Sequence, residues 1–178
     1  TVLFPGVIIP VNIGREKSLK LIRYAYKSSV PFGVIAQRDT NTENPKQADL
    51  YTIGTVATVL KILEMPDGTT TAIIQGKKRF ELDDILYDEP YHVGKIMVKQ
   101  EEKIINEDQE HNAIAEALKD MALKIVKYSS NIPNEAGFAL KNIESMLFLI
   151  NFISSNTDID YRSKQELLEI DTLKERAT

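Results

Sequence analysis

The chain has 178 residues, of which 43% are hydrophobic and 27% are charged. This composition is typical of a globular protein and excludes a wholly disordered, collagen-like or membrane-spanning chain. With no cysteine and two histidines, the chain lacks disulfide frameworks, thiolate metal sites and cysteine nucleophiles. The formal net charge of −4 disfavours specific nucleic-acid binding, because such surfaces need an excess of basic residues.

Charge and glycine content divide the sequence near residue 102. Residues 1–102 carry 13 basic and 13 acidic side chains, whereas residues 103–178 carry 9 and 13. All glycines except Gly137 precede the division. We therefore predict an α+β chain with two domains, a β domain over residues 1–102 and a helical subdomain over residues 103–178.

The first region predicts strands, because short runs of β-branched and aromatic residues alternate with turn-forming residues. The predicted strands cover residues 2–13, 32–37, 52–64, 70–76, 79–86 and 91–99. One inserted helix is expected over residues 15–27, with Leu19, Ile22 and Tyr26 on its apolar stripe. The segment 38–49 has no aliphatic run and predicts an exposed, mobile loop.

A hairpin is predicted between Ile53 and Ile74. Its turn, Met65-Pro66-Asp67-Gly68, combines a proline of fixed φ with a glycine that accepts a positive φ. The apolar residues of the first strand fall on both faces, with Val56, Leu60 and Ile62 on one and Ala57, Val59 and Leu63 on the other. We expect this strand to be covered on both sides or to lie in a closed barrel.

From Glu107 onward the apolar residues follow the period of a helix. The stripe runs to Tyr128, before Pro133 and Asn134, and predicts about six helical turns. Residues 135–154 predict one buried helix or a bent helix pair, with an apolar core too short to span a bilayer. A last helix is expected from Tyr161 or Ser163, followed by a turn that the chain end interrupts. Together these elements predict a small helical bundle, truncated at its C-terminal end.

The sequence contains no motif of a known catalytic site. There is no G-x-x-x-x-G-K-[ST] phosphate loop, no H-E-x-x-H metal motif and no G-x-S-x-G nucleophile motif. His92 and His111 stand alone, and the adjacent carboxylates at 83–84 and 88–89 point to opposite faces of a strand. The basic run at 77–79 is interpreted as solvated surface at a turn. We expect no catalytic, cofactor-binding or metal-binding residue, and no hydrolysis of ATP or peptides by this chain.

Three groups of segments carry a family resemblance. They are residues 2–10 (VLFPGVIIP) with 14–18 (GREKS), residues 49–57 (DLYTIGTVA) with 66–69 (PDGT) and 75–80, and residues 164–169 (KQELLE) with Asp171, Glu175 and Arg176. Over nearly its whole length the chain resembles the N-terminal substrate-binding domain of the Lon ATP-dependent proteases. The resemblance implies a PUA-like β pseudo-barrel with one inserted helix, followed by a C-terminal α-helical bundle.

The resemblance also implies a function for the intact protein. In that family the region precedes an ATPase module, which uses ATP and Mg²⁺, and a serine protease domain with a Ser-Lys dyad. The whole enzyme is a cytoplasmic homohexamer, an ATP-dependent endopeptidase of protein quality control. Neither catalytic module lies within residues 1–178.

Two hypotheses for this chain follow. In the first, it is a non-catalytic module that binds unfolded or damaged proteins, assists hexamer assembly and delivers substrate to the ATPase pore. Recognition of many sequences favours adaptable apolar side chains, and the candidates are Phe4, Tyr51, Met65, Met146, Phe148 and Phe152. Core packing is the favoured interpretation for residues 146–152, whereas Met65 lies in a turn and is expected to be exposed. The alternative is a stand-alone adaptor or regulatory protein of the same fold, without ATPase or protease modules.

Overall fold

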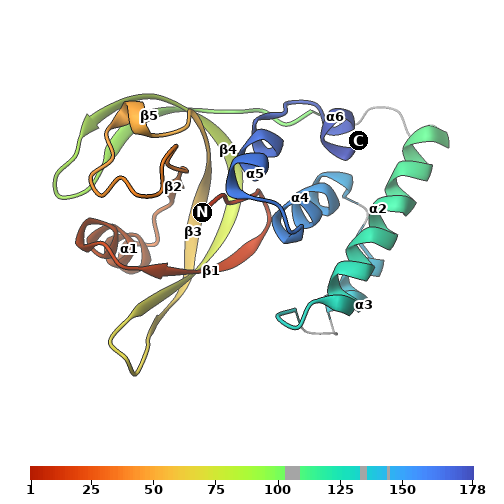
Figure 1. The fold of residues 1–178 in the computed structure, drawn as a ribbon, viewed down its shortest axis with the longest axis horizontal. Coiled ribbons are helices and arrows are strands. Elements are labelled where there is room, and N and C mark those ends of the chain that lie inside the picture. Colours follow the sequence, from red (N-terminus) through yellow and green to blue (C-terminus); the bar gives the residue numbers. More distant parts are fainter. Residues whose placement is uncertain (103–108, 133–135, 144) are drawn as a thin grey trace. The chain divides into compact units, whose positions relative to one another are not determined.

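The computed structural model describes residues 1–102, 109–132, 136–143 and 145–178. Two compact units are present, Thr1–Gln100 and Glu101–Thr178. The first contains an antiparallel sheet with one long helix and the second contains helices, so the chain is α+β (Figure 1). The predicted helix start at Glu107 and the predicted break at Pro133 and Asn134 lie outside the described residues.

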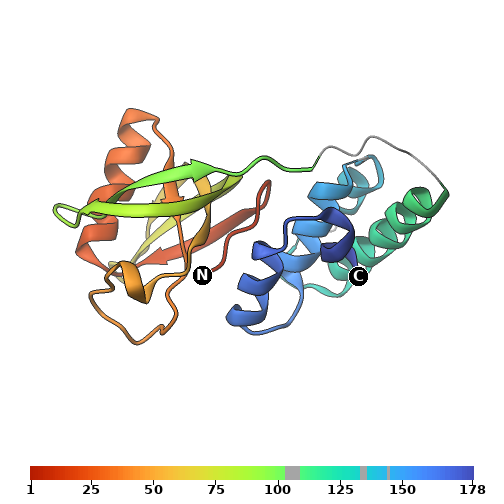
Figure 2. The ribbon, with the colours of Figure 1, turned by 90° about the horizontal axis from the view of Figure 1, so that it is seen from above.

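The first unit is built on one antiparallel sheet. Its elements are β1 (Ile8–Ile13), α1 (Glu16–Ser28), β2 (Phe32–Val34), the 3-10 turn η1 (Gln47–Asp49), β3 (Ile53–Glu64), β4 (Thr70–Tyr87) and β5 (Val93–Val98). The strand order is β1-β4-β3-β2, and β5 pairs with the second half of β4 to form a long two-stranded ribbon (Figure 2). Among the described strands, the pairing stays open at β1 and β2 and does not close into a barrel.

The core of the first unit lies between α1 and the sheet. Ile22 of α1 packs with Ala57, Ala72 and Ile74, all of which are buried. Tyr26, which was predicted to share the apolar stripe, is instead 48% exposed. The buried side of the helix is therefore centred on Ile22 and the neighbouring Ala25.

Strand β4 continues without a break through residues 77 and 78, where the sequence predicted a turn between two strands. The reason is Gly76, which is buried where the N-terminal segment crosses β4. The Gly76 N–H donates to the Val7 carbonyl at 2.9 Å, and a Cβ at this position would collide with the Phe4 carbonyl oxygen. A glycine is therefore needed here because the backbone of the N-terminal segment approaches β4 closely, and not because the chain turns. The predicted strand over 2–13 correspondingly begins only at Ile8.

The basic run at 77–79 differs from the solvated surface that the sequence predicted. Lys77 and Lys78 are exposed, but Arg79 is completely buried within β4. An irregularity in the β3–β4 register explains the difference, because Ala57 pairs with Gly76 whereas Thr55 pairs with Arg79, so that β4 has one extra residue at this point and the alternation of its side chains shifts by one.

The predicted β3–β4 hairpin is confirmed. The Met65 N–H donates to the Thr69 carbonyl at 2.8 Å, and Gly68 has a φ of 84°. The predicted face pattern fails beyond Val59, because an irregularity in register between Val59 and Lys61 shifts the alternation by one residue. Ile62 therefore packs against the core, and Leu60 is exposed.

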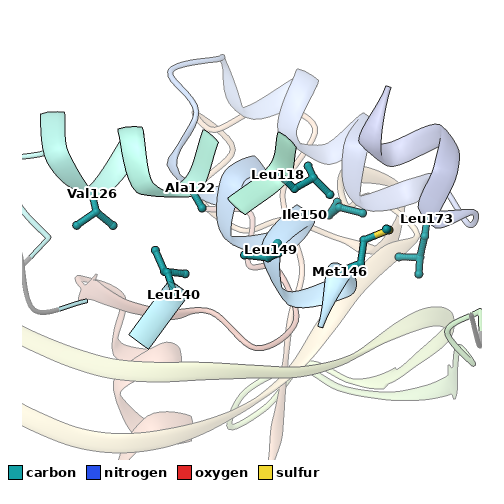
Figure 3. Close-up of a cluster of buried hydrophobic side chains, with 8 residues drawn as sticks. All are labelled: Leu118, Ala122, Val126, Leu140, Met146, Leu149, Ile150 and Leu173. Atoms are coloured by element: carbon teal, nitrogen blue, oxygen red, sulfur yellow. The ribbon is translucent and has the colours of Figure 1, made fainter. Parts of the chain in front are cut away.

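The second unit consists of helices. They are α2 (Gln109–Tyr128), α3 (Ala136–Lys141), α4 (Met146–Asn156), α5 (Tyr161–Glu169) and α6 (Leu173–Ala177). The bent-pair alternative for 135–154 is confirmed by α3 and α4, and the last predicted helix begins at Tyr161. Buried side chains spaced one helical turn apart on α2 pack against α4, around a completely buried Leu149 (Figure 3).

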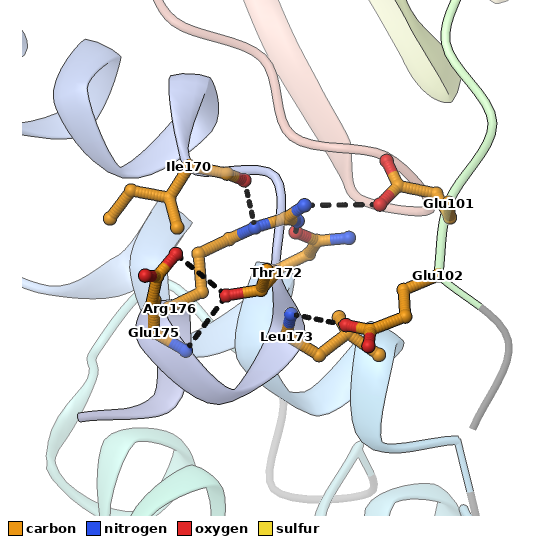
Figure 4. Close-up of polar contacts among 8 residues, drawn as sticks. Glu101, Glu102, Ile170, Thr172, Leu173, Glu175 and Arg176 are labelled. Atoms are coloured by element: carbon orange, nitrogen blue, oxygen red, sulfur yellow. Dashed lines mark hydrogen bonds and ion pairs between the residues drawn. The ribbon is translucent and has the colours of Figure 1, made fainter. Parts of the chain in front are cut away.

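A buried polar cluster joins α6 to the first residues of this unit (Figure 4). The Arg176 guanidinium, whose side chain has no solvent exposure, lies 3.0 Å from Glu101 Oε2. It also donates to the Ile170 carbonyl at 2.8 Å and, at 3.4 Å, to Asn151 Oδ1. Beside it, the Leu173 N–H at the start of α6 donates to Glu102 Oε2 at 3.2 Å. Charged hydrogen bonds of this kind hold α6 against residues 101 and 102.

Helix α5 begins at a charged cap. Asp160 Oδ1 accepts the Arg162 and Ser163 N–H groups at 2.8 and 3.1 Å. The Ser163 hydrogen bonds, followed by that from Arg162, lower the pKa of Asp160 below its ordinary value of 3.8. The ionised cap therefore stabilises the folded state above pH 3.8, and this contribution is lost as the pH falls through the lowered pKa.

We expect Asp160→Asn to lower the melting temperature at pH 7, because the neutral amide is a weaker acceptor than the carboxylate. The difference from the unchanged chain should shrink below pH 3.8, as the pH falls through the lowered pKa of the Asp160 carboxyl group. Thermal unfolding followed by circular dichroism between pH 3 and pH 7 measures both effects. Asp158→Asn removes the same charge two residues earlier, outside the cap. An equal loss in the two variants would assign the effect to net charge instead of capping.

Candidate functional site

Exposed apolar side chains gather on the two-stranded ribbon of the first unit, which we define as residues 82–87 of β4 together with β5. All six residues of β5 are exposed. Within the ribbon, the most exposed apolar side chains are Tyr87, Met97 and Leu86, at 63%, 59% and 52%, and they are joined by Val93, Ile96 and Val98. Such a concentration of apolar surface is typical of a site that binds another protein.

A groove with a volume of about 790 Å³ adjoins the ribbon. Its walls are Arg15 with the first turn of α1, residues 43–48, and residues 85–87 of β4 with the following Asp88. Leu86 and Tyr87 line the groove and are also exposed on the ribbon, so the two features form one continuous candidate surface. We name it the ribbon–groove surface.

Hydrogen bonds anchor the loop that forms one wall of the groove. Arg15, just before α1, donates to Gln37 Oε1 at 2.9 Å and to the Thr42 carbonyl at 3.0 Å. The Gln47 side chain donates to the Asp83 carbonyl at 3.1 Å and accepts the Ile85 N–H at 2.9 Å. The segment 38–49 was predicted to be an exposed, mobile loop. These hydrogen bonds hold it against Arg15, which precedes α1, and against residues 83 and 85 of β4.

Helix α1 also holds the turn of the ribbon. The Lys17 ammonium lies 2.7 Å from Glu89 Oε1 and donates to the Asp88 carbonyl at 2.8 Å. The hydrogen bond that Lys17 donates to Glu89 raises the pKa of Lys17, so this side chain stays charged throughout the neutral range. Farther along α1, the rings of Tyr24 and Tyr91 stack with centroids 6.4 Å apart.

The candidate residues from the sequence lie in several different places. Phe4 and Met146 are buried in the cores of their units, so neither side chain offers surface to a partner in this structure. Phe148 and Phe152 are half-buried on α4, with ring centroids 6.1 Å apart. Tyr51 is half-buried beneath the Arg38 guanidinium, and Met65 is 44% exposed at the tip of the β3–β4 hairpin.

Reasoning from the sequence missed the ribbon–groove surface. The apolar run of β5 was predicted as a strand, but consecutive Ile96, Met97 and Val98 are equally typical of a buried strand. Whether such a strand lies at an edge depends on its partners, which are distant in sequence. The groove is likewise formed by segments near residues 15, 45 and 86, which are far apart in the sequence, so no local motif predicts it.

Among the described residues, no group of three or more His, Asp or Glu side chains is arranged to hold a metal ion. ATP and Mg²⁺, the cofactors that the family resemblance implies, do not fit the glycine and lysines at 76–78, because Gly76 is packed against Phe4 inside a strand. Asp83 and Glu89 form ion pairs with Lys95 and Lys17. In the described part of the chain, no helix is both long enough and apolar enough to cross a membrane.

Comparison with known proteins defines the family. Residues 1–178 match the family described as the ATP-dependent protease La (LON) substrate-binding domain. The chain belongs to this family. It is 50% identical over 177 residues to the Lon protease of Flavobacterium johnsoniae, covering 99% of this chain and 22% of that protein. It is 44% identical over 176 residues to the Lon protease of Parabacteroides distasonis, covering 99% of this chain and 21% of that protein.

Solved structures of Lon N-terminal domains share the fold. The N-terminal domain of Mycobacterium avium complex Lon protease superimposes with a TM-score of 0.68 at 18% identity, covering 99% of this chain and 89% of that one. A Lon N-terminal domain protein from Xanthomonas campestris gives a TM-score of 0.67 at 17% identity, covering 98% and 88%. The Lon family chain described here thus spans about a fifth of the length of its curated relatives.

Proposed function

We propose that this chain is the substrate-binding region of a Lon-type ATP-dependent serine protease and that it captures unfolded or damaged polypeptides. The family match over residues 1–178 carries the proposal. The apolar ribbon beside a groove supports it, because unfolded chains expose the apolar segments that such a surface can cover. In the whole protein, ATP and Mg²⁺ would be used by a separate ATPase module, and peptide bonds would be cleaved by a further module with a Ser-Lys dyad.

We further propose that captured substrate passes from this region to the ATPase pore of a homohexamer, whose assembly the region assists. The greater length of the curated relatives supports this arrangement over a stand-alone adaptor. In the same proposal, unit Thr1–Gln100 corresponds to a PUA-like pseudo-barrel and unit Glu101–Thr178 to a helical bundle, with the domain boundary near residue 102.

The proposal predicts binding of a reduced, carboxymethylated protein, which stays unfolded without denaturant. The dissociation constant is expected in the micromolar range, because ordering a disordered chain offsets part of the interaction free energy. Met97→Ser should weaken binding about fivefold, since it removes an apolar side chain from the ribbon. Fluorescence anisotropy with a labelled unfolded protein measures both quantities.

Two other exposed methionines provide matched comparisons. Met121 on α2 is 50% exposed, and Met121→Ser should leave the affinity unchanged. Met65→Ser tests the candidate at the β3–β4 turn and should weaken binding about twofold, because a single apolar side chain there contributes less than the ribbon. A flat titration up to high micromolar concentration would contradict the proposed function, whereas equal losses at positions 97 and 121 would contradict the choice of surface.

A further inference from the structure

The outer edge of β5 is available for pairing with another strand. Within the part of the chain that the structure describes, β4 is the only strand that pairs with β5. In an antiparallel pair, alternate N–H and C=O groups of an edge strand point away from its neighbour. All six residues of β5 are exposed, so these outward backbone groups are accessible.

The other two edges of the described sheet carry features that discourage pairing. β1 contains Pro10, which has no N–H to donate, and β2 is only three residues long. Proteins commonly protect sheet edges with prolines, short strands or charges. β5 has no proline, and its single charged residue, Lys95, forms an ion pair with Asp83 at 3.5 Å. The β5 edge is thus the least protected of the three.

The side chains along β5 determine what kind of strand would fit. Val93 and Met97 lie on one face of the ribbon, whereas Ile96 and Val98 lie on the other. An added strand would therefore meet exposed apolar neighbours on both of its faces. Aliphatic and β-branched residues suit such positions.

The charge near β5 distinguishes between two possible partners for this edge, β5 of a second copy and an extended segment of another polypeptide. The ribbon together with its turn and flanking residues, 81–100, contains five acidic and two basic side chains, which gives this stretch a net charge of −3. Pairing of β5 with β5 of a second copy would bring two ribbons of the same negative charge together. An extended segment that carries lysine or arginine beside its apolar residues would instead be attracted.

We propose that the outer edge of β5 captures extended segments of unfolded polypeptides by strand addition, with a preference for aliphatic segments flanked by basic residues. The inference rests on the proposed function and specifies where and how the polypeptide is held. Backbone pairing is independent of side-chain identity, so this mode suits a surface that must accept many sequences.

Hydrogen exchange with the 1–178 chain tests the inference. The probe is a short peptide of alternating valine and threonine with two lysines at each end. Alternate amides of β5 should exchange at least about tenfold more slowly with saturating peptide, because they become hydrogen-bonded. A control peptide has every valine and threonine amide N-methylated. It keeps its side chains and charges, but its valines and threonines have no backbone N–H to donate to β5, so its affinity should fall at least about tenfold. Replacing the four lysines by glutamates should also weaken binding.

Four results would overturn the inference. If the peptide and the unfolded protein bind while exchange in β5 is unchanged, the proposed function stands and strand addition at β5 is wrong. Equal affinity of the N-methylated peptide would lead to the same conclusion. Protection of β5 that grows with protein concentration in the absence of peptide would assign the edge to a second copy. If neither peptide nor unfolded protein binds, the proposed function fails as well.

Discussion

Replacing Arg176 by methionine is expected to destabilise unit Glu101–Thr178 by about 3 kcal/mol, because the change leaves the largely buried Glu101 without its guanidinium partner. Methionine keeps much of the side-chain volume, so the loss reflects charge and hydrogen bonding more than a cavity. The Ile170 carbonyl and Asn151 Oδ1 lose a donor at the same time. Urea denaturation followed by circular dichroism measures the free energy of unfolding.

An exposed position on the same helix offers a matched control. Lys174 lies two residues earlier on α6 and pairs with Glu110 at 2.9 Å, but both side chains are about two-thirds exposed. Lys174→Met should therefore change the free energy of unfolding by less than about 0.5 kcal/mol. The double variant Arg176→Met with Glu101→Gln should regain part of the lost stability, because the negative charge that Arg176 balanced is removed together with the guanidinium. A loss in Arg176→Met no larger than in Lys174→Met would show that the buried cluster contributes little.

Replacing Gly76 by alanine is expected to destabilise unit Thr1–Gln100 by about 2–3 kcal/mol, at the upper end of the usual cost of overpacking. The added Cβ would meet the Phe4 carbonyl oxygen, and backbone can move aside less easily than a flexible side chain. The φ of Gly76 is not in the left-handed region, so the effect comes from lack of space and not from backbone strain.

Gly14→Ala is the control for this prediction, because a Cβ at Gly14 would meet no atom within 4 Å. It should leave stability within about 0.5 kcal/mol of the unchanged chain. Hydrogen exchange resolves the two units, and only amides before residue 101 should lose protection in Gly76→Ala. Equal stability of the two alanine variants would mean that the N-terminal segment can move away from β4 at little cost.

Local signals predicted most of the elements. The helices of the second unit follow from long apolar periods and from caps such as Asp160 and Thr172, whose side chains accept N–H groups of the following turn. The β3–β4 hairpin follows from a proline and a glycine at positions that fix the turn. In these cases the residues that determine the structure lie within a few positions of each other.

Tertiary contacts determined what the sequence could not reveal. Gly76 resembles a turn residue, yet its small size serves the crossing of a segment about 70 positions earlier. The irregular register after Val59 depends on how β3 pairs with β4, and it determines that Ile62 packs against the core while Leu60 is exposed. The ribbon–groove surface was missed for the same reason. The position of β5 at an edge and the walls of the groove both depend on contacts between segments that are far apart in the sequence.

The buried pair of Glu101 and Arg176 also sets an order of events during synthesis. The two residues are 75 positions apart, so their contact cannot form until α6 has left the ribosome. Until then, Met146 and Ile150 lack Leu173, which joins them in the core. The strands of unit Thr1–Gln100 pair with one another within residues 8–98, so this sheet can form while the helices are still being made. A nascent chain arrested before residue 173 should therefore carry a folded sheet followed by helices still open to chaperones and proteases.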